Sequence, residues 1–544
     1  MAGSTHTVTN QVPPLVGYDV FSADRALAAA VERHVEPGLS EEVLGELSAL
    51  GRTSGSAQVQ EWGVLANENP PRLRTHDRYG NRIDEVEFHP SWHRLLGKGV
   101  SAGLTAAWDR PAGHVRRAAA FVVWTQVEAG NGCPLSMTHA AVPALRTDPE
   151  LAAEWEPRLT SMVYDRELRP AHLKAGALFG MGMTEKQGGS DVRANTTSAR
   201  PLAQDGTYEL TGHKWFCSAP MSDGFLVLAQ APGGLTCFLV PRVLRDGTRN
   251  VFLLQRLKDK LGNRSNASAE VEFDGTWARR VGEEGRGVRT IIEMVAATRL
   301  DCVLGSAGLM RQAVAQAVHH CSHREAFGSK LTDQPLMRNV LADLALESEA
   351  ATTLALRLAA AWDDGGEQER ALLRIAVPAA KYWVTKRCPA VAVEAAECLG
   401  GNGYVEESGM PRLVRESPLN SIWEGAGNVQ ALDVVRALRR EPAALDAYLR
   451  EVGQARGADH RLDAAVKDLL TELADLDGVE GRARRLVERL ALVLQGSLLV
   501  RFAPPQVADA FCAGRLGGDG GAAFGTLPHT LDLASVVERA RPVS

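Results

Sequence analysis

The 544-residue chain lacks any cysteine pattern that would support a metal site or a disulfide scaffold. Its eight cysteines include no Cys-x-x-Cys pair and follow no regular spacing. This absence excludes zinc-finger folds and small disulfide-rich secreted folds, because both need paired or regularly spaced cysteines. We therefore predict reduced thiols, no bound metal and a cytoplasmic location.

The chain also lacks long apolar runs and a strong excess of charge. Hydrophobic residues make up 45% of the sequence, but no stretch reaches the roughly 18 unbroken apolar residues that a membrane span needs. The formal net charge of -6 argues against a surface that attracts nucleic acid everywhere, so any DNA contact would be a local patch. The first residues lack the basic, apolar, small order of a signal peptide, and we predict no targeting segment.

Hydrophobic periodicity divides the chain into four predicted regions. Several domains are expected, because the chain is longer than the size at which a single hydrophobic core stops growing. The predicted fold is mainly α with a central β domain. The first region begins with a Thr/Asn/Gln-rich arm that either packs on a neighbouring subunit or stays mobile. The regions are 1–180 (arm and helical domain), 181–285 (β-sheet domain), 286–440 (helical bundle) and 441–544 (extra helical domain).

Four motifs carry candidate chemistry. They are Gly182-Met-Thr-Glu-Lys-Gln-Gly-Gly-Ser-Asp191, Thr211-Gly-His-Lys-Trp-Phe-Cys-Ser-Ala219, Arg324-Glu-Ala-Phe-Gly-Ser-Lys-Leu331 with Gln334, and Cys398-Leu-Gly-Gly-Asn-Gly-Tyr404 followed by Asn420-Ser-Ile-Trp-Glu-Gly-Ala-Gly-Asn428. The last places one acid, Glu424, between an aromatic residue and a glycine, which makes it a candidate base. Taken alone, each motif also fits a plain structural role: a turn, a buried strand with its aromatics in the core, or a solvated loop acid.

In this order and at these separations, the four motifs resemble the acyl-CoA dehydrogenase family of FAD flavoenzymes, over roughly residues 50–440. Within that family, the runs 181–193 and 261–268 and the C-terminal extension 441–544 are most similar to the AidB branch, which is associated with the adaptive response to DNA alkylation. The resemblance implies a helical domain, a β domain, a helical bundle and an extra C-terminal helical domain, assembled as a homotetramer.

The resemblance also implies which residues hold FAD. Thr184 and Ser190 match hydroxyl residues that hold the flavin and its diphosphate, Phe216 stands where the family places a Trp on the flavin, and Ser218 replaces a Thr that donates near N5. A second group matches residues that reach the FAD of a neighbouring subunit. The full predicted cofactor set is Gly182, Met183, Thr184, Gly189, Ser190, Phe216, Ser218, Arg324, Phe327, Gln334, Gly400, Gly401, Gly403, Trp423 and Asn428.

Glu424 matches the family's catalytic base, which removes the α-proton of an acyl-CoA while a hydride leaves the β-carbon for flavin N5. Such a base needs a dry site and a polarised thioester carbonyl. The residues that match substrate positions are Glu185, Arg264 and Arg299. Ala426 and Gly427 replace hydroxyl residues that commonly follow the base, so we predict weak activity. The resemblance to the AidB branch implies a short branched acyl-CoA, such as isovaleryl-CoA, as the substrate.

The resemblance implies that double-stranded DNA is bound by the C-terminal extension, although the charge of the extension gives little support. Residues 441–544 contain 12 Lys/Arg and 15 Asp/Glu, a balance of -3. Clustered arginines could still form one basic face for double-stranded DNA. The alternative is a solvated amphipathic helix with i,i+4 ion pairs. The candidates are Arg439, Arg440, Arg482, Arg484, Arg485 and Arg489.

Three functions stay open at this point. The first is an FAD-dependent acyl-CoA dehydrogenase-like enzyme linked to protection of DNA from alkylation, with either electron-transfer flavoprotein or oxygen as acceptor. The second is a DNA-binding protective protein with a vestigial redox site. The third is a flavin oxidase that acts on nitroalkane-like or alkylating compounds. The first and third would need a base in the same place, so only product analysis separates them.

Overall fold

The computed structural model describes residues 5–542 and divides the chain into two compact units. The first, which we call the helical unit, consists of Met1–Ala57 together with Cys302–Ser544. The second, the sheet unit, is Gln58–Asp301. The boundary between them falls inside one long helix, α8 (Gly287–His323).

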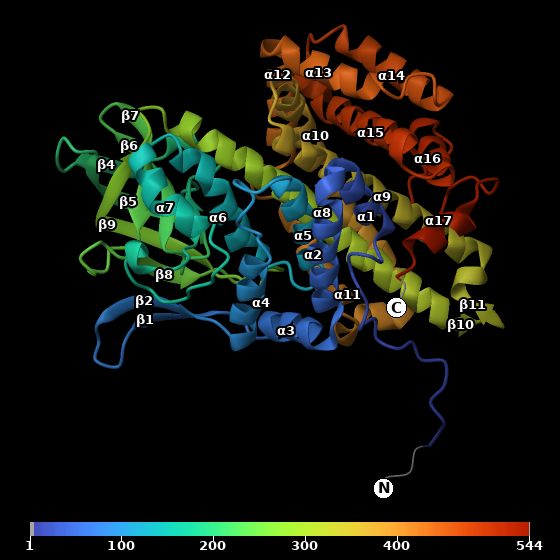
Figure 1. Ribbon diagram of the computed structural model, residues 1–544, viewed down its shortest axis with the longest axis horizontal. Coiled ribbons are helices and arrows are strands. Elements are labelled where there is room, and N and C mark those ends of the chain that lie inside the picture. The colour runs from blue at the N-terminus through green and yellow to red at the C-terminus, as the bar shows by residue number, and fades with distance from the viewer. Residues whose placement is uncertain (1–4, 543–544) are drawn as a thin grey trace. The chain divides into compact units, whose positions relative to one another are not determined.

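The sheet unit is built around a sheet that closes on itself (Figure 1). Its strands run in the order β6-β4-β5-β9-β7, and β7 pairs back with β6, so these five form a small barrel. Strand β3 adds to β6, and β8 adds to β9. The bounds are β3 (Phe179–Gly182), β4 (Ser198–Pro201), β5 (Thr207–Ser218), β6 (Gly224–Ala231), β7 (Gly234–Pro241), β8 (Leu253–Leu257) and β9 (Ser268–Val281).

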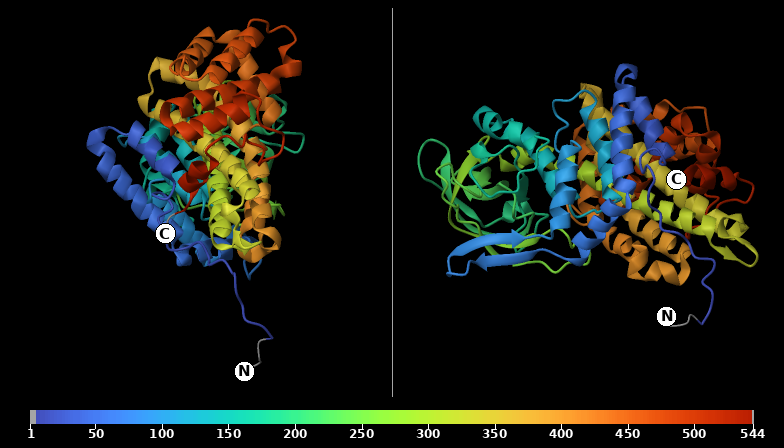
Figure 2. Two further views of the ribbon diagram at one scale, coloured as in Figure 1. Left: turned by 90° about the vertical axis from the view of Figure 1, so that its right-hand side faces the viewer. Right: turned by 60° about the horizontal axis from the view of Figure 1, so that its bottom comes forward.

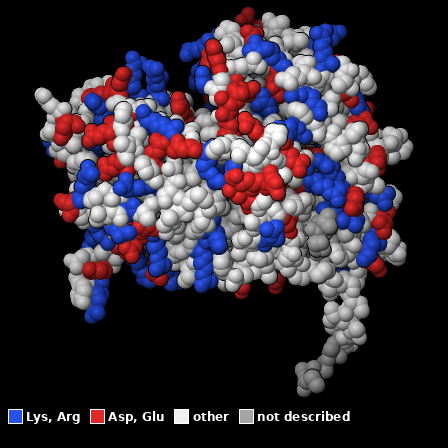
Figure 3. All heavy atoms as spheres, viewed as in Figure 1, with Lys and Arg blue, Asp and Glu red and all other residues white. Residues whose placement is uncertain are grey.

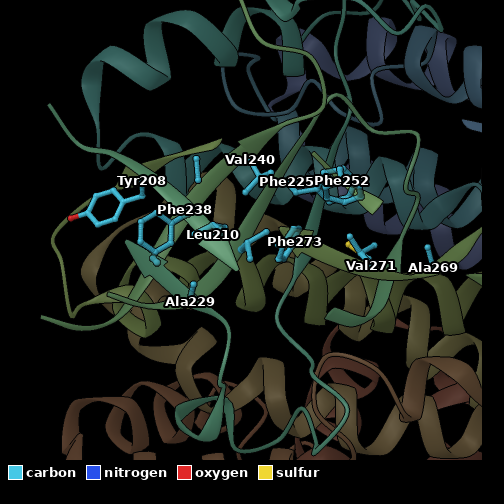
Figure 4. Packing of buried hydrophobic residues seen from close by; sticks show 14 of the residues in the cluster. Tyr208, Leu210, Phe225, Ala229, Phe238, Val240, Phe252, Ala269, Val271 and Phe273 are labelled. Carbon is cyan, nitrogen blue, oxygen red and sulfur yellow. The ribbon is translucent and has the colours of Figure 1, made fainter. Parts of the chain in front are cut away.

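Phenylalanines fill the centre of this barrel (Figure 4). The rings of Phe225 and Phe252 stack with 4.7 Å between their centroids, and Phe273 meets Phe252 edge to face at 5.7 Å. Burying each ring stabilises the fold by about 1.5–3 kcal/mol. The closed barrel is therefore a rigid platform for the loops that leave its strands.

Helices and one hairpin complete the sheet unit. The helices are α3 (Ala57–Glu68), α4 (Pro90–Ser101), α5 (Gly113–Thr125), α6 (Gly132–Leu145) and α7 (Pro149–Leu159). The hairpin, β1 (Arg72–His76) with β2 (Arg82–Glu87), packs Leu73 and Val86 against the barrel core. Helix α7 begins where the Asp148 carboxylate accepts hydrogen bonds from the backbone amides of the first turn, which is a typical N-cap.

The helical unit is built on two long antiparallel helices, α9 (Pro335–Asp364) and α10 (Glu367–Cys398). Proline at the first turn starts α9, and Gly365 ends it in a left-handed conformation (φ 61°), which glycine adopts without strain. Figure 2 shows the later helices, in orange and red, layered on this pair. The other helices are α1 (Arg25–His34), α2 (Pro37–Gly55), α11 (Met410–Glu416), α12 (Gly427–Arg440), α13 (Pro442–Gly453), α14 (His460–Leu473), α15 (Ala483–Phe502), α16 (Pro505–Phe511) and α17 (Leu533–Ala540).

Ion pairs attach the C-terminal segment to α9 within this unit. The Arg515 guanidinium bonds to the buried carboxylates of Asp343 and Glu347, both on α9. Asp343 also accepts from the backbone amide of Gly525, 3.0 Å away. The segment after α16 is therefore part of the bundle's surface layer.

The predicted fold class, mainly α with a central β domain and an extra C-terminal helical domain, is confirmed. Within residues 5–542, no helix is both long and apolar enough to cross a membrane. The four-domain division stays a prediction, because the compact units group the chain differently from the sequence regions.

Candidate functional site

The candidate base, Glu424, lies in the helical unit in the tight connection before α12. Its backbone is left-handed (φ 58°), and Gly425 after it also has a positive φ of 91°. A left-handed non-glycine residue costs about 1–3 kcal/mol and persists only where its surroundings impose it. Such strain marks Glu424 as a residue whose position the fold enforces.

Two buried side chains impose that conformation. The Lys381 ammonium, on α10, donates to the backbone carbonyls of Trp423 (2.8 Å) and Gly425 (2.9 Å). The Gln430 amide, on α12, donates to the carbonyls of Glu424 (3.0 Å) and Gly425 (2.8 Å). Three successive carbonyls are thus held by a cation and an amide that are each 1% exposed.

Sequence reasoning missed Lys381 and Gln430. The only available signal was a lysine within the buried face of a helix, next to Ala379, Ala380 and Val384. A lysine is rarely buried without a partner, so its place on that face indicates a specific acceptor. Nothing in the sequence names that acceptor, which lies on a connection some forty residues later.

In the sheet unit, the first motif forms the loop that follows β3. Its Glu185 carboxylate is fully buried and accepts from the Lys214 ammonium (2.8 Å) and from the Thr197 hydroxyl (2.6 Å). The backbone and hydroxyl of Thr196 add two further hydrogen bonds, at 2.7 and 2.9 Å. Glu185 is therefore enclosed beneath the loop, away from its surface.

The electrostatics of this pair are set by burial and by contact. Burial alone would raise the pKa of the Glu185 carboxyl, but the hydrogen bonds and the charge of Lys214 outweigh it and hold that pKa well below its usual range. Burial lowers the pKa of the Lys214 ammonium, against the stabilising effect of Glu185. The pair joins the loop to β5, which contains Lys214, and the same ammonium links both to β6 because it donates to the Leu228 carbonyl (2.8 Å).

The outer part of the same loop is open. Gly188 (φ 144°) and Ser190 are exposed, and a Cβ at Gly188 would contact no atom within 4 Å. A Cβ at Gly189 would lie only 2.4 Å from the Thr184 hydroxyl, so glycine is required there. Gly182 ends β3 beside β6, and Met183 is half-buried. The loop thus presents hydroxyls beside bare backbone, which suits a phosphate-bearing ligand.

The last part of strand β5 turns Phe216 outward, whereas Tyr208 near its start is buried in the barrel core. The pairing with β9 shifts register between Lys214 and Cys217, and this bulge leaves Lys214 in the core while Phe216 is 52% exposed. Trp215 is half-buried beneath the Lys258 ammonium, 3.3 Å from its ring centre. The alternative of a strand with its aromatics in the core does not hold for Phe216, whose exposed ring could pack against a flat cofactor.

Ser218 ends β5 directly opposite Ser268 at the start of β9. Their hydroxyl oxygens lie 3.1 Å apart. Of the predicted substrate residues, Arg264 is exposed on the loop before β9 and donates to the Lys260 carbonyl (3.2 Å), and Arg299 lies half-buried on α8. The structure thus gathers the first two motifs and both arginines into the sheet unit.

The third motif forms a hairpin, β10 (Glu325–Ala326) with β11 (Ser329–Lys330), in the helical unit. At its tip Phe327 is 100% exposed with a φ of 54°. The Gln334 amide donates to the Ala326 carbonyl (2.8 Å), next to the tip. The Phe327 ring therefore projects fully into solvent from the described chain.

The N-terminal arm contacts its own chain at this hairpin. The Asn10 side chain exchanges two hydrogen bonds with the backbone of Glu325, at 2.8 and 2.9 Å, and the Arg324 guanidinium donates to the Asn10 carbonyl. His319 bonds to the Pro13 carbonyl (2.8 Å). The two outcomes we predicted for the arm, contact with a neighbour or mobility, both overlooked this intramolecular contact.

The glycine run after α10 divides into two kinds of position. Gly400 (φ 60°) and Gly401 are exposed, and a Cβ on either would contact no atom within 4 Å. A Cβ on Gly403 would lie 2.0 Å from the Ala396 carbonyl, so close packing explains that glycine. Trp423 is half-buried with its indole donating to Asn420 (3.0 Å), and Asn428 is exposed in the first turn of α12.

Most candidate DNA-binding arginines already have acidic or aromatic partners. Arg482 and Arg489 both pair with Glu472, at 3.7 and 2.9 Å, and Arg439 lies 3.8 Å from Glu480. Arg484 donates to the Tyr382 hydroxyl (3.2 Å). Arg440 and Arg485 are exposed. Figure 3 shows blue and red atoms interspersed over the face in view, so that face has no large area of one sign.

No metal site accompanies these residues: between residues 5 and 542, no three His, Cys, Asp or Glu side chains are grouped to hold an ion. All eight cysteines are free and buried. Burial raises the pKa of the Cys217 thiol, behind Phe216 on β5, to about 12, which makes it a poor nucleophile. The candidate chemistry therefore rests on carboxylate, hydroxyl, amide and cationic groups.

Comparison with known families covers most of the chain. Residues 10–166 match the adaptive response protein AidB N-terminal domain, residues 180–276 match the acyl-CoA dehydrogenase middle domain, and residues 285–439 match the acyl-CoA dehydrogenase C-terminal domain. The three matches follow the order of the motifs and leave the region after residue 439 outside them.

Individual relatives extend over almost the whole chain. The AidB protein of Escherichia coli (strain K12) is 46% identical over 527 residues, which cover 96% of each chain. Acyl-CoA dehydrogenase family member 11 of Caenorhabditis elegans is 30% identical over 497 residues, covering 84% of this chain and 80% of the relative. The crystal structure of Caenorhabditis elegans ACDH-11 in complex with C11-CoA superimposes with a TM-score of 0.85 at 26% identity, covering 94% of each chain.

Proposed function

Because the chain belongs to the acyl-CoA dehydrogenase family, in its AidB-like branch, we propose that Glu424 is the base that removes the α-proton of a short branched acyl-CoA. Family membership makes the protein an FAD-dependent oxidoreductase. The observation that carries the proposal is the strained backbone of Glu424, which Lys381 and Gln430 hold in place.

The residues of the sheet unit fit FAD. The open loop offers the Thr184 and Ser190 hydroxyls beside bare backbone at Gly188, and Phe216 offers an exposed ring. We propose that these residues, with Ser218 at the flavin edge, hold the cofactor. When bound, FAD accepts the hydride that leaves the substrate β-carbon. We propose that Glu185 supports the loop from beneath and does not itself contact substrate, because its carboxylate is fully buried.

The base acts through its position. A carboxylate contributes about 10²–10⁴-fold to a proton transfer when it lies within hydrogen-bond reach of the proton. A flexible glutamate would lose that advantage, so the two donors that fix the backbone on either side of Glu424 serve the same end. We propose Arg264 and Arg299 as substrate contacts, since both are cationic side chains in the sheet unit.

The test is anaerobic mixing of the yellow protein with isovaleryl-CoA while the flavin absorption band is followed. Glu424→Gln should slow the loss of that band by about 10²–10⁴-fold while FAD stays bound. Glu407 is an exposed acid in the same unit, and Glu407→Gln is the matched control. The flavin of this variant should be reduced at the rate seen in the unsubstituted protein. Rapid reduction of Glu424→Gln would remove Glu424 from the role of base.

Substrate length is a separate part of the proposal. Caenorhabditis elegans ACDH-11 was crystallised with C11-CoA, so a C11 acyl-CoA is the natural competitor. We propose that isovaleryl-CoA reduces the flavin faster than C11-CoA does. If C11-CoA reduces the flavin faster, the role proposed for Glu424 would stand. The proposed substrate would then be a long-chain acyl-CoA and not a short branched one. Product analysis with a nitroalkane in place of the thioester would detect oxidase chemistry at the same carboxylate.

We also propose a cytoplasmic homotetramer in which the hairpin and glycine run are covered by a neighbouring copy. Phe327 is 100% exposed, Tyr404 is 91% exposed and Leu336 is 83% exposed, all in the helical unit. Exposed apolar side chains of this size favour an interface where they form one patch. Light scattering should report four copies, and Phe327→Ala should lower both the assembled fraction and the FAD content. A stable monomer that retains FAD would contradict this arrangement.

DNA protection is the second candidate function. It is favoured by the match of residues 10–166 to the adaptive response protein AidB N-terminal domain. If α15 contacts phosphates, Arg485→Glu should weaken duplex DNA binding. It should also reduce, by about 1, the steepness with which the logarithm of the binding constant falls with the logarithm of the salt concentration. Arg25→Glu, an exposed arginine on α1, gives the same charge change as a control. Equal effects of the two variants would show that α15 is not the DNA contact. DNA would then bind another surface, or binding would respond only to the net charge of the protein.

A further inference from the structure

A short chain of hydrogen bonds runs from a lysine to the hydroxyl that we place at the flavin edge. The Ser218 and Ser268 hydroxyl oxygens lie 3.1 Å apart, and the Lys260 ammonium lies 3.0 Å from the Ser268 oxygen. The same ammonium donates to the Asn266 carbonyl at 2.6 Å. The antiparallel register of β5 and β9 pairs Ser218 with Ser268 across fifty residues of sequence.

The chemistry of the three groups gives this chain a direction. An ammonium has only donors, so Lys260 must donate to the Ser268 oxygen. When Ser218 donates outward, its oxygen is free to accept from Ser268, whose own proton is available for that bond. Each link then polarises the next, so the outermost hydroxyl becomes a stronger donor than an isolated serine.

A side chain on the adjoining loop, Asn266, has unpaired polar atoms within the described part of the chain. Asn266 is 1% exposed, and neither its amide nitrogen nor its amide oxygen has a hydrogen-bond partner among the described residues. Buried polar groups are normally paired, so these two atoms call for a ligand or solvent partner. Asn266 lies on the loop that Lys260 holds, two residues before Ser268.

We propose that Lys260 is a positioning residue that acts through Ser268, keeps the Ser218 proton directed at the flavin and thereby raises the flavin reduction potential. The inference rests on the proposed function, because it takes FAD at Ser218. It adds a residue that no motif marks. Reduction brings electron density to the flavin edge, and a hydroxyl backed by a cation stabilises that density more than a hydroxyl alone.

The first test measures the midpoint potential of the bound flavin against a reference dye, without acyl-CoA. Lys260→Met should shift the reduction equilibrium about tenfold toward oxidised flavin, which equals about 30 mV for a two-electron couple. Ser268→Ala, which breaks the middle link and leaves the charge, should give a shift of similar size and sign. Lys98→Met, an exposed lysine on α4, is the control and should leave the potential unchanged.

The second test separates a hydrogen-bond chain from a distant charge. In a Ser218→Ala background, Lys260→Met should produce no further shift, because the last link is already missing. A shift that persists in that background would show that Lys260 acts through space and would overturn the proposal. An unchanged potential in both Lys260→Met and Ser268→Ala would overturn it as well.

Loss of FAD from Lys260→Met would show that the lysine also holds the loop, through the Asn266 carbonyl. Ser268→Ala then decides, since it spares that contact: a shifted potential supports the chain, and an unchanged one rejects it. The measurement needs no substrate turnover. It therefore stands apart from the outcome for Glu424, and failure of the unsubstituted protein to bind FAD would reject the proposed function itself.

Discussion

The two units present their candidate cofactor residues in opposite ways. In the sheet unit, the loop after β3 is supported by its own chain, because Glu185 receives bonds from Lys214, Thr196 and Thr197. In the helical unit, the hairpin tip and the glycine run face outward, with Phe327 100% exposed. The first surface is preorganised by internal contacts, whereas the second acquires its contacts only when something covers it.

The largest expected effect is on the self-supported side. Lys214→Met would leave the Glu185 carboxylate buried without its cation, and we expect it to lower the free energy of unfolding by about 3–5 kcal/mol. Urea unfolding measures the loss. Replacing both partners, as Lys214→Met with Glu185→Met, should recover much of it, because no charge then stays buried. Equal stability of the single and double variants would show that the pair does not brace this loop.

A matched pair of glycines tests the outward-facing side. Gly403→Ala should destabilise the protein by about 1–3 kcal/mol, because its Cβ would lie 2.0 Å from the Ala396 carbonyl. Gly401→Ala meets no atom within 4 Å in its own chain and should leave the unfolding midpoint unchanged. If a cofactor or a neighbouring copy packs there, the same variant should still weaken FAD binding, measured by release of flavin fluorescence. Unchanged FAD affinity would show that this surface stays uncovered.

The smallest effect is a pH dependence that also differs between the units. Burial, followed by the charges of Arg117 and Arg146, lowers the pKa of His114 in the sheet unit to about 3, and burial lowers that of His34 in the helical unit to about 4. Each histidine stays neutral when folded but takes up a proton below pH 6.5 when unfolded. The free energy of unfolding therefore carries no penalty from these histidines above pH 6.5, and it falls as the pH drops toward 4.

His114→Gln should remove about 1 kcal/mol of the stability loss between pH 7 and pH 5.5, because glutamine binds no proton. Hydrogen exchange at the two pH values would follow β5 and α9 separately. We expect amides of β5 to lose protection first, since the pKa of buried His139 in the sheet unit is also well below its usual value. Earlier loss on α9 would reverse the order proposed for the two units.

Much of the architecture followed from pattern alone. The change from helical to alternating periodicity near Gly182 indicated the barrel strands, and the return near Val288 indicated α8, which begins at Gly287. The family matches confirm the predicted family and fold class. The prediction succeeded because four ordered motifs carry more information than any one of them. The roles of individual residues, including Glu424, stay predictions until they are measured.

What the sequence could not provide is the set of contacts between distant segments. The run Lys214-Trp-Phe-Cys reads as a strand with its aromatics in the core, but a bulge against β9 buries the lysine and exposes Phe216. That bulge depends on a partner strand fifty residues away. Likewise, Lys381 and Gln430 contact the connection that contains Glu424 only after α10 and α12 pack together. Local propensity contains neither fact.

The division of the chain into units has a consequence for its biosynthesis. The helical unit needs both Met1–Ala57 and residues from Cys302 onward, so Gln58–Asp301 is an insertion in its sequence. A ribosome that adds 5–20 residues per second would delay the partners of α1 and α2 by roughly ten to fifty seconds. During that interval Leu27, Val31 and Val43 have no core to enter. We expect the nascent helices to be a binding site for chaperones while the barrel folds first.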